Sequence, residues 1–272
     1  MSIAPIGFFD SGIGGVSVWK EVTQLLPKEN TIYYADSKNS PYGSKSISEI
    51  QNISLKNSNW LIDKGCKLIV VACNTATTNA ISLLRKKFQI PFVGIEPGIK
   101  PAVKKSKKGK IGVLATKGTL SSELFEKTTK SINTNNFDII ESHGDGIVEI
   151  IESGDFENDK LESILIEYLK PMIDYGIDQL VLGCTHYFII QDLIKKIIGN
   201  NIIINNYNVA VASQVERILI TEKIVNSEKN EIYNDFYSNG NNFALEKLLG
   251  KKNSIIKICL LYTSDAADDS LG

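Results

Sequence analysis

The segment KLIVVACNTATTNA, residues 67–80, joins an almost unbroken apolar run to a cysteine and a row of small polar residues. An apolar run without alternation is typical of a strand that is buried on both faces, as in a parallel sheet. Cys73 therefore stands where a strand turns into a helix. A single cysteine at such a place is more often packing than chemistry, so its interpretation depends on the rest of the chain.

Apolar runs of this kind recur along the chain and alternate with helix-length segments. In the segment 46–65, for example, Ile47, Ile50 and Ile53 recur at roughly helical spacing. The alternation predicts an α/β fold in which helices cover parallel sheets. The predicted strands are residues 6–9, 31–35, 67–72, 91–95, 110–115, 137–141, 179–183 and 201–205.

Small polar or ionisable residues follow several of these strands directly. In open α/β sheets, ligands bind outside the carboxyl ends of the strands, so these residues predict one polar site. They are Asp10, Ser11, Asp36, Ser37, Cys73, Asn74, Thr75, Thr116, Cys184, Thr185 and His186.

Two of the strands resemble each other in what they carry. The segments LIVVACNTA and QLVLGCTHY both run from an apolar strand through a small residue to a cysteine and then to polar side chains. The cysteines, Cys73 and Cys184, are about one domain length apart, which predicts two similar halves with one thiol each. A substrate held between the halves would meet a sulfur on either side.

Two opposed thiols can invert a carbon centre. One group removes a proton from one face and the other returns a proton to the opposite face, so one must be deprotonated and the other protonated. A thiol with an ordinary pKa of about 8.5 suits both roles, because a helix N-terminus or a nearby cation favours the thiolate. His186, two residues after Cys184, could lend or remove a proton there.

Composition narrows the class of partner. The chain has 272 residues, with 30 Lys and Arg against 31 Asp and Glu, and a net charge of −1. No global field attracts nucleic acid or an acidic membrane, so we expect a small-molecule partner. We find neither a secretory leader nor an apolar run long enough to span a bilayer, and we expect a cytoplasmic protein.

The cysteine spacing predicts no metal site and no disulfides. Cys66, Cys73, Cys184 and Cys259 show no C-x-x-C pairing and no histidine at zinc spacing. We expect free thiols, with Cys66 in a packing role. The glycines of DSGIGG, residues 10–15, do not fit a dinucleotide-binding fingerprint, and we interpret them as permitting a tight turn.

Four motifs together resemble the bacterial glutamate racemases of the aspartate/glutamate racemase superfamily. They are FFDSGIGGVSV (8–18), YYADSKNSPYG (33–43), VVACNTA (70–76) and LGCTHY (182–187), and the resemblance extends from about residue 6 to about residue 250. It implies a cofactor-independent isomerase that interconverts L-glutamate and D-glutamate. It also implies a role in supplying D-glutamate for peptidoglycan, and hence for cell wall and cell shape, and a homodimer.

The resemblance also implies roles for individual residues. It makes Cys73 the acid/base for D-glutamate and Cys184 the one for L-glutamate. Asp10 would assist a thiol, His186 would assist Cys184, and Glu152 would support that same side. The implied substrate-binding residues are Asp10, Ser11, Pro41, Tyr42, Gly43, Asn74, Thr75, Thr116, Thr185 and His186.

By the same resemblance we expect two flavodoxin-like α/β domains, pseudo-symmetric about a cleft. The first would hold residues 1–96 and 208–258, and the second residues 97–207. The composition becomes rich in Ala and Asp near the end, so we interpret residues 259–272 as a non-native tail that does not pack.

Two stretches depart from the family's pattern. Most relatives have an Asp-Ser pair where this chain has Asn205 and the residues up to Val215, and Pro-Leu where it has Phe188 and Ile189. We expect the second change to affect only local packing. The alternatives are another amino-acid or hydantoin racemase of the superfamily, and an inactive relative that binds glutamate without turnover.

Overall fold

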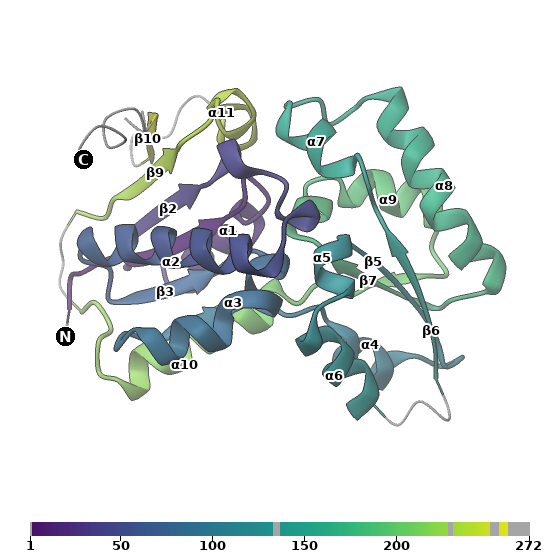
Figure 1. Ribbon diagram of the computed structural model, residues 1–272, viewed down its shortest axis with the longest axis horizontal. Coiled ribbons are helices and arrows are strands. Elements are labelled where there is room, and N and C mark those ends of the chain that lie inside the picture. Colours follow the sequence, from purple (N-terminus) through teal and green to yellow (C-terminus); the bar gives the residue numbers. More distant parts are fainter. Residues whose placement is uncertain (1, 133–136, 228–230, 251–255, 261–272) are drawn as a thin grey trace, which may run out of the picture.

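The computed structural model describes residues 2–132, 137–227, 231–250 and, for the backbone, 256–260. Two parallel sheets, each flanked by helices, lie side by side (Figure 1). Strand pairing is parallel throughout the described ladders, as the sequence predicted. None of the helices in the described ranges is long and apolar enough to cross a membrane.

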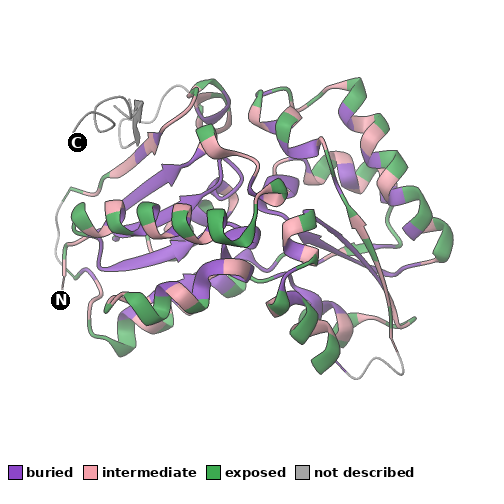
Figure 2. Ribbon diagram, in the orientation of Figure 1, coloured by how far each residue is buried: buried purple, intermediate pink, exposed green. Residues whose placement is uncertain are grey.

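The first sheet, sheet A, has the strand order β10-β9-β2-β1-β3-β4. Its first four strands in chain order are buried because helices cover both faces (Figure 2). The strands and helices of this part are β1 (Ile6–Asp10), α1 (Val16–Leu25), β2 (Thr31–Ala35), η1 (Ser37–Asn39), η2 (Tyr42–Ser44), α2 (Ile47–Asp63), β3 (Leu68–Val71), α3 (Asn74–Lys87) and β4 (Phe92–Gly94).

The second sheet, sheet B, has the order β6-β5-β7-β8. Its part of the chain comprises α4 (Ile99–Lys105), β5 (Lys110–Ala115), α5 (Lys117–Leu120), α6 (Glu123–Ser131), β6 (Asp138–His143), α7 (Ile147–Glu152), α8 (Asp159–Tyr175), β7 (Gln179–Gly183), η4 (Thr185–Phe188), α9 (Gln191–Ile198) and β8 (Ile203–Ile204). The chain then returns to sheet A through α10 (Asn208–Thr221), β9 (Asn234–Ser238), α11 (Phe243–Leu249) and β10 (Ile256–Leu260).

The two sheets share one internal order. The first strand lies between the second and the third, and the fourth follows the third, both in β2-β1-β3-β4 and in β6-β5-β7-β8. This is the start of the flavodoxin-like order, and it confirms two flavodoxin-like parallel sheets. The third strand of each, β3 or β7, is the one that ends at a candidate thiol. The domain boundaries at 96 and 207 stay a prediction.

The returning segment differs from the sequence-based expectation in one respect. We expected residues 259–272 to stay unpacked, but the backbone of residues 259 and 260 pairs with β9 as the end of β10. Any backbone can extend a sheet edge by its own hydrogen bonds, whatever its origin. Residues 261–272 lie outside the described part of the chain.

Candidate active site

The two thiols that the sequence paired lie at equivalent ends of the two sheets. Cys73 ends the connection from β3 and caps α3, and Cys184 follows β7 and precedes η4. Both side chains are buried, at 4% and 6% exposure. The charge of Cys184 contributes to the pKa of Cys73, so the two sulfurs lie within electrostatic reach of each other. Cys66 is also a free, buried cysteine, as expected, and burial raises its pKa to about 12.

Cys73 is held as a thiol by its surroundings. Burial raises its pKa well above the ordinary value, and the charge of Asp10 raises it further. Two contacts oppose this shift: Ala76 N–H donates to the sulfur at 3.4 Å, and the sulfur lies 3.8 Å from Ser11 Oγ. The helix N-terminus offers the hydrogen bond that a thiolate would accept.

Asp10 connects the two halves. It is fully buried at the end of β1, and its Oδ2 accepts a hydrogen bond from Gly15 N–H at 2.8 Å. Thr185 Oγ1, from the residue after Cys184, lies 3.5 Å from both carboxylate oxygens. Burial raises the pKa of Asp10 to about 6, although the charge of His186 and the Gly15 N–H lower it.

His186 lies between Cys184 and Glu152. Its Nδ1 is 3.8 Å from Cys184 Sγ, and its Nε2 is 2.6 Å from Glu152 Oε1. Burial alone would lower the pKa of His186, but the contacts with Cys184 and Glu152 outweigh it and raise the pKa well above the ordinary value. This shift favours the protonated imidazole, and a cation beside a sulfur favours the thiolate.

Glu152, at the end of α7, completes this side. Burial would raise its pKa, but His186 and the N–H of Ile13 outweigh burial and lower the pKa. The Ile13 N–H donates to Glu152 Oε1 at 2.7 Å, so Glu152 also binds the loop after Asp10. Within the described residues, no three His, Cys, Asp or Glu side chains are grouped to hold a metal ion.

The glycines of the DSGIGG loop serve close approach. A Cβ on Gly12 would lie 1.9 Å from Glu152 Oε1, and one on Gly14 would lie 2.6 Å from His186 Nδ1. The chain does turn here, since the Val16 N–H donates to the Ile13 carbonyl at 3.1 Å, although neither glycine has a positive φ. Only a residue without a side chain lets this loop touch the segment that carries Cys184.

Three threonine hydroxyls meet where α3 and α5 begin. Thr75 Oγ1 is 2.7 Å from Thr116 Oγ1 and 3.1 Å from Thr119 Oγ1, and the latter two are 3.0 Å apart. All three side chains are buried. Thr75 and Thr116 were predicted, whereas Thr119 was missed. Its signal was the spacing of three after Thr116, which brings both to one side of a helical turn.

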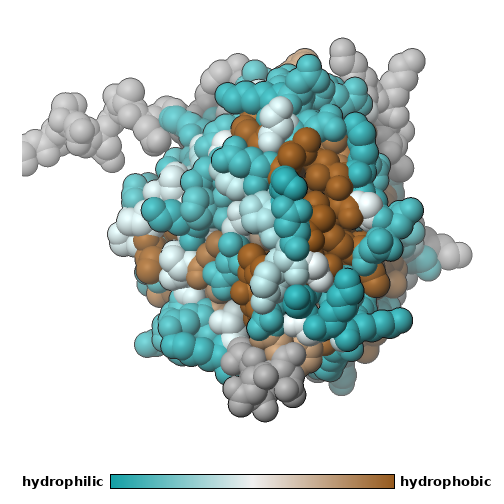
Figure 3. All heavy atoms as spheres, turned by 90° about the vertical axis from the view of Figure 1, so that its right-hand side faces the viewer, coloured by the Kyte–Doolittle hydropathy of each residue, from teal (hydrophilic) through white to brown (hydrophobic). Residues whose placement is uncertain are grey.

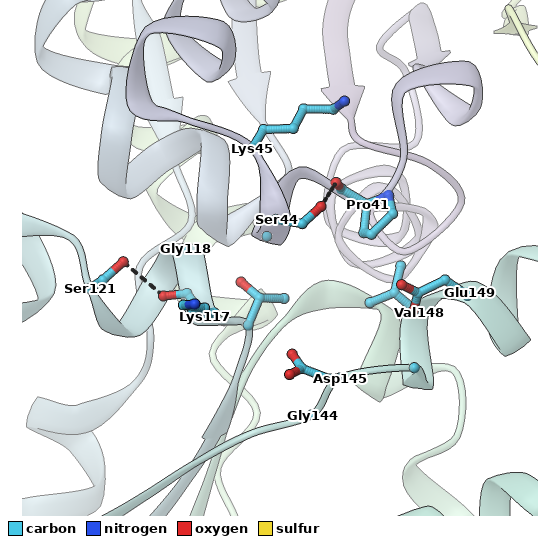
Figure 4. Close-up of a pocket in the computed structure, with 13 residues that line it drawn as sticks. Pro41, Ser44, Lys45, Lys117, Gly118, Ser121, Gly144, Asp145, Val148 and Glu149 are labelled. Atoms are coloured by element: carbon cyan, nitrogen blue, oxygen red, sulfur yellow. Dashed lines mark hydrogen bonds between the residues drawn. The ribbon is translucent and has the colours of Figure 1, made fainter.

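A cleft of about 420 Å³ opens next to this threonine cluster. Pro41, Gly43 and Thr116, all predicted, are among its lining residues. Figure 4 shows Pro41 and Ser44 on one side of it and Asp145 and Glu149 on the other, so the two halves of the molecule form its opposite walls. The thiols are buried and do not line this cleft. Thr116 does line it, and Thr116 contacts Thr75, which is two residues after Cys73.

Tyr42, predicted to bind substrate, directs its hydroxyl elsewhere. It donates to Asp36 Oδ2, and Asn57 Nδ2 donates to the Tyr42 hydroxyl at 3.0 Å. Asp36 is fully buried and also accepts hydrogen bonds from Asn39 and Asn239. Burial raises the pKa of Asp36, while these donors oppose the shift. Asp36 was predicted at the polar strand ends but was given no catalytic or binding role, and through Tyr42 it anchors the loop that holds Pro41 and Gly43.

The Asn74 side chain has partners on two other segments. Its Nδ2 donates to the Ile95 carbonyl at 3.2 Å, and its Oδ1 lies 3.4 Å from the Tyr207 hydroxyl. The structure thus brings together Asp10, Ser11, Cys73, Cys184 and the residues around them. It places Asn74 on the connection between the two halves.

Comparison with known proteins places the chain in a family. The profile of the Asp/Glu/Hydantoin racemase family matches residues 6–212. The chain is 44% identical to a glutamate racemase of Cupriavidus pinatubonensis over 217 residues, which is 80% of this chain and 79% of the relative.

Solved structures are similar over nearly the whole chain. A glutamate racemase of Bacillus anthracis superposes with a TM-score of 0.84 at 30% identity, covering 96% of this chain and 98% of that one. A glutamate racemase of Francisella tularensis in complex with D-glutamate superposes with a TM-score of 0.80 at 29% identity, covering 95% and 98%. On its sequence and its fold, this chain belongs to the Asp/Glu/hydantoin racemase family.

Proposed function

We propose that this protein interconverts L-glutamate and D-glutamate by moving a proton between two thiols, without a cofactor. The observation that carries the proposal is the pair of buried cysteines at the same position of two equivalent sheets. The names of the relatives, and the D-glutamate bound to one of them, support glutamate as the substrate.

The proposed reaction balances on the two sulfurs alone. The thiolate of one cysteine takes the α-proton, and the electron pair stays on the α-carbon, delocalised into the α-carboxylate. The thiol of the other cysteine then gives its proton to the opposite face. The carbon is inverted and the two sulfurs have exchanged protonation states. We assign Cys73 to D-glutamate and Cys184 to L-glutamate, as the family resemblance implies.

The neighbours of each sulfur suit these roles. The cationic His186, held by Glu152, stabilises the Cys184 thiolate. Asp10 binds the substrate ammonium, which neutralises the Asp10 charge. That charge then no longer raises the pKa of Cys73. Substrate binding is thus what activates Cys73.

We assign the threonine cluster to the side-chain carboxylate of glutamate. Three buried hydroxyls can turn their protons from one another toward an anion. Thr119→Val should therefore raise KM for glutamate about tenfold, the effect of losing one hydrogen bond to a charged group, with kcat changed less than threefold. Steady-state kinetics measure both. Thr128→Val, whose hydroxyl bonds to the Leu124 carbonyl on the α6 surface, is the matched control.

Asp10 should give the pH profile its acid limb. Since its pKa lies at about 6, it is ionised above that pH and protonated below it. In the proposal only the ionised form binds the ammonium, so kcat/KM should fall about tenfold per pH unit below pH 6. The limb should vanish in Asp10→Asn. It should move to higher pH in His186→Asn, because the charge of His186 lowers the pKa of Asp10. A limb unmoved in both variants contradicts the assignment.

The function itself is tested with wild-type protein in deuterium oxide. L-glutamate, L-aspartate and a hydantoin are each supplied without cofactor, and NMR follows the α-proton while circular dichroism follows racemisation. We expect exchange and racemisation of glutamate. Exchange of another substrate alone would favour a different racemase of the superfamily, and binding of glutamate without exchange would favour an inactive relative.

The wider setting is part of the same proposal. We propose that the protein acts in the cytoplasm, supplies D-glutamate for peptidoglycan, and forms a homodimer. The apolar side chains gathered on the sheet B end of the molecule, with Ile166 43% exposed, support self-association (Figure 3). Light scattering in solution should give twice the chain mass of 30.0 kDa. A mass of one chain would contradict the dimer.

A further inference from the structure

Tyr207 stands where the chain crosses from sheet B back to sheet A. It lies between β8 and α10, and α10 packs against α1 and β4 of the sheet A half. Its side chain is buried, at 5% exposure. This residue belongs to the stretch that departs from the family's pattern, so the family resemblance assigns it no role.

The Tyr207 hydroxyl reaches both thiol-bearing segments. It donates to the carbonyl of Leu182, which is two residues before Cys184 in β7. It also lies 3.4 Å from Oδ1 of Asn74, the residue after Cys73. The Asn74 amide is oriented by its own bond to the Ile95 carbonyl, so its oxygen faces Tyr207.

The ring of Tyr207 is held as firmly as its hydroxyl. Phe188 packs edge-on against it, with ring centroids 5.1 Å apart and planes at 88°. On another side is Gly98, the residue before α4, where the chain first crosses between the sheets; a Cβ there would lie 2.8 Å from the ring. The two sequence departures, at Phe188 and in 205–215, therefore form one packing contact.

We propose that Tyr207 is a positioning residue that sets the spacing between Cys73 and Cys184 by bridging the segments that carry them. This inference rests on the proposed two-thiol function. Proton transfer needs the reacting atoms at about 3–3.5 Å, and a misplacement of 1 Å can cost about 100-fold. Tyr207 contacts Asn74, next to Cys73, and Leu182, near Cys184. Losing these contacts should therefore change the distance between the two sulfurs more than the environment of either one.

A reaction that needs only one thiol distinguishes a changed separation of Cys73 and Cys184 from a general loss of activity. With 3-chloroglutamate, a single thiolate takes the α-proton while the electron pair forms the double bond and chloride leaves; the enamine hydrolyses to 2-oxoglutarate and ammonium. This elimination needs no second sulfur. Racemisation needs both.

The variant Tyr207→Phe keeps the ring and removes the hydroxyl. We expect glutamate racemisation to fall tenfold or more in kcat, with KM within threefold, while the elimination rate stays within threefold of wild type. Tyr175→Phe is the control, because it removes a tyrosine hydrogen bond, to Asp138 at 2.7 Å, on an exposed part of sheet B. It should leave both rates unchanged.

Other outcomes are equally clear. Racemisation within twofold of wild type in Tyr207→Phe, or an equal loss of both reactions, overturns the inference. Should that variant not fold, Phe188→Leu loosens the ring instead, and again racemisation must fall more than elimination. Wild-type protein that does not racemise glutamate sinks the proposed function, a result distinct from any behaviour of the variants.

Discussion

Replacing Cys73 with Ser should lower glutamate racemisation by about 10³-fold or more, and Cys184→Ser should do the same. A serine hydroxyl ionises far too weakly to act as base, and general acid–base catalysis contributes about 10²–10⁴-fold per group. Because L-glutamate and D-glutamate have equal free energies, kcat/KM must fall equally in both directions. Circular dichroism, started from either enantiomer, measures the loss.

The two serine variants should differ in elimination. With 3-chloroglutamate, each should retain activity toward one α-configuration only: Cys73→Ser toward the L form and Cys184→Ser toward the D form. Cys66→Ala is the matched control and should racemise at the wild-type rate, since Cys66 precedes β3 and lies at the opposite end of that strand from Cys73. Retention of racemisation by both serine variants would end the two-thiol mechanism.

Lys67→Met should destabilise the fold by about 3–5 kcal/mol, because it leaves a carboxylate buried without its counter-ion. Lys67 Nζ lies 2.6 Å from Glu29, and the two side chains are 5% and 2% exposed. Glu29 also accepts the Asn226 N–H at 2.8 Å, and so ties the end of the returning segment to sheet A. The thermal midpoint should fall by on the order of 10 °C, as calorimetry would record.

The partner variant tests the cause. Lys67→Met combined with Glu29→Gln removes both charges, keeps an acceptor for Asn226, and should recover much of the loss. Lys130→Met breaks an exposed pair with Glu126, 74% and 59% exposed, and should cost less than about 1 kcal/mol. If Lys67→Met were as stable as Lys130→Met, burial of the charge would not be the cause.

The strands of the sheet core could be predicted from sequence because their surroundings are uniformly apolar. Residues 31–35, 110–115 and 179–183 are strands with the predicted bounds. β9 was missed because Asn234–Ser238 is half-polar, and only Phe236 and Ser238 are buried in it. A strand near a sheet edge needs less apolar surface, so its pattern fades.

The site residues that directly follow a strand could be predicted from the sequence. Cys73 and Cys184 stand out because their two strands repeat one pattern. Thr119 and Tyr207 could not be found in this way, because each acts through contacts made by folding: Thr119 with Thr75, and Tyr207 with Leu182. Sequence spacing shows which residues share an element, but not which elements meet.

Burial of the two sulfurs, at 4% and 6% exposure, also bears on how fast the enzyme can work. If these sulfurs are the catalytic pair, glutamate must reach them by a movement of the cleft walls, and the frequency of that opening then sets a ceiling on turnover. A turnover rate that drops as glycerol thickens the solvent would reveal such a ceiling. In the proposed mechanism, the same burial would also shield the carbanion from bulk water.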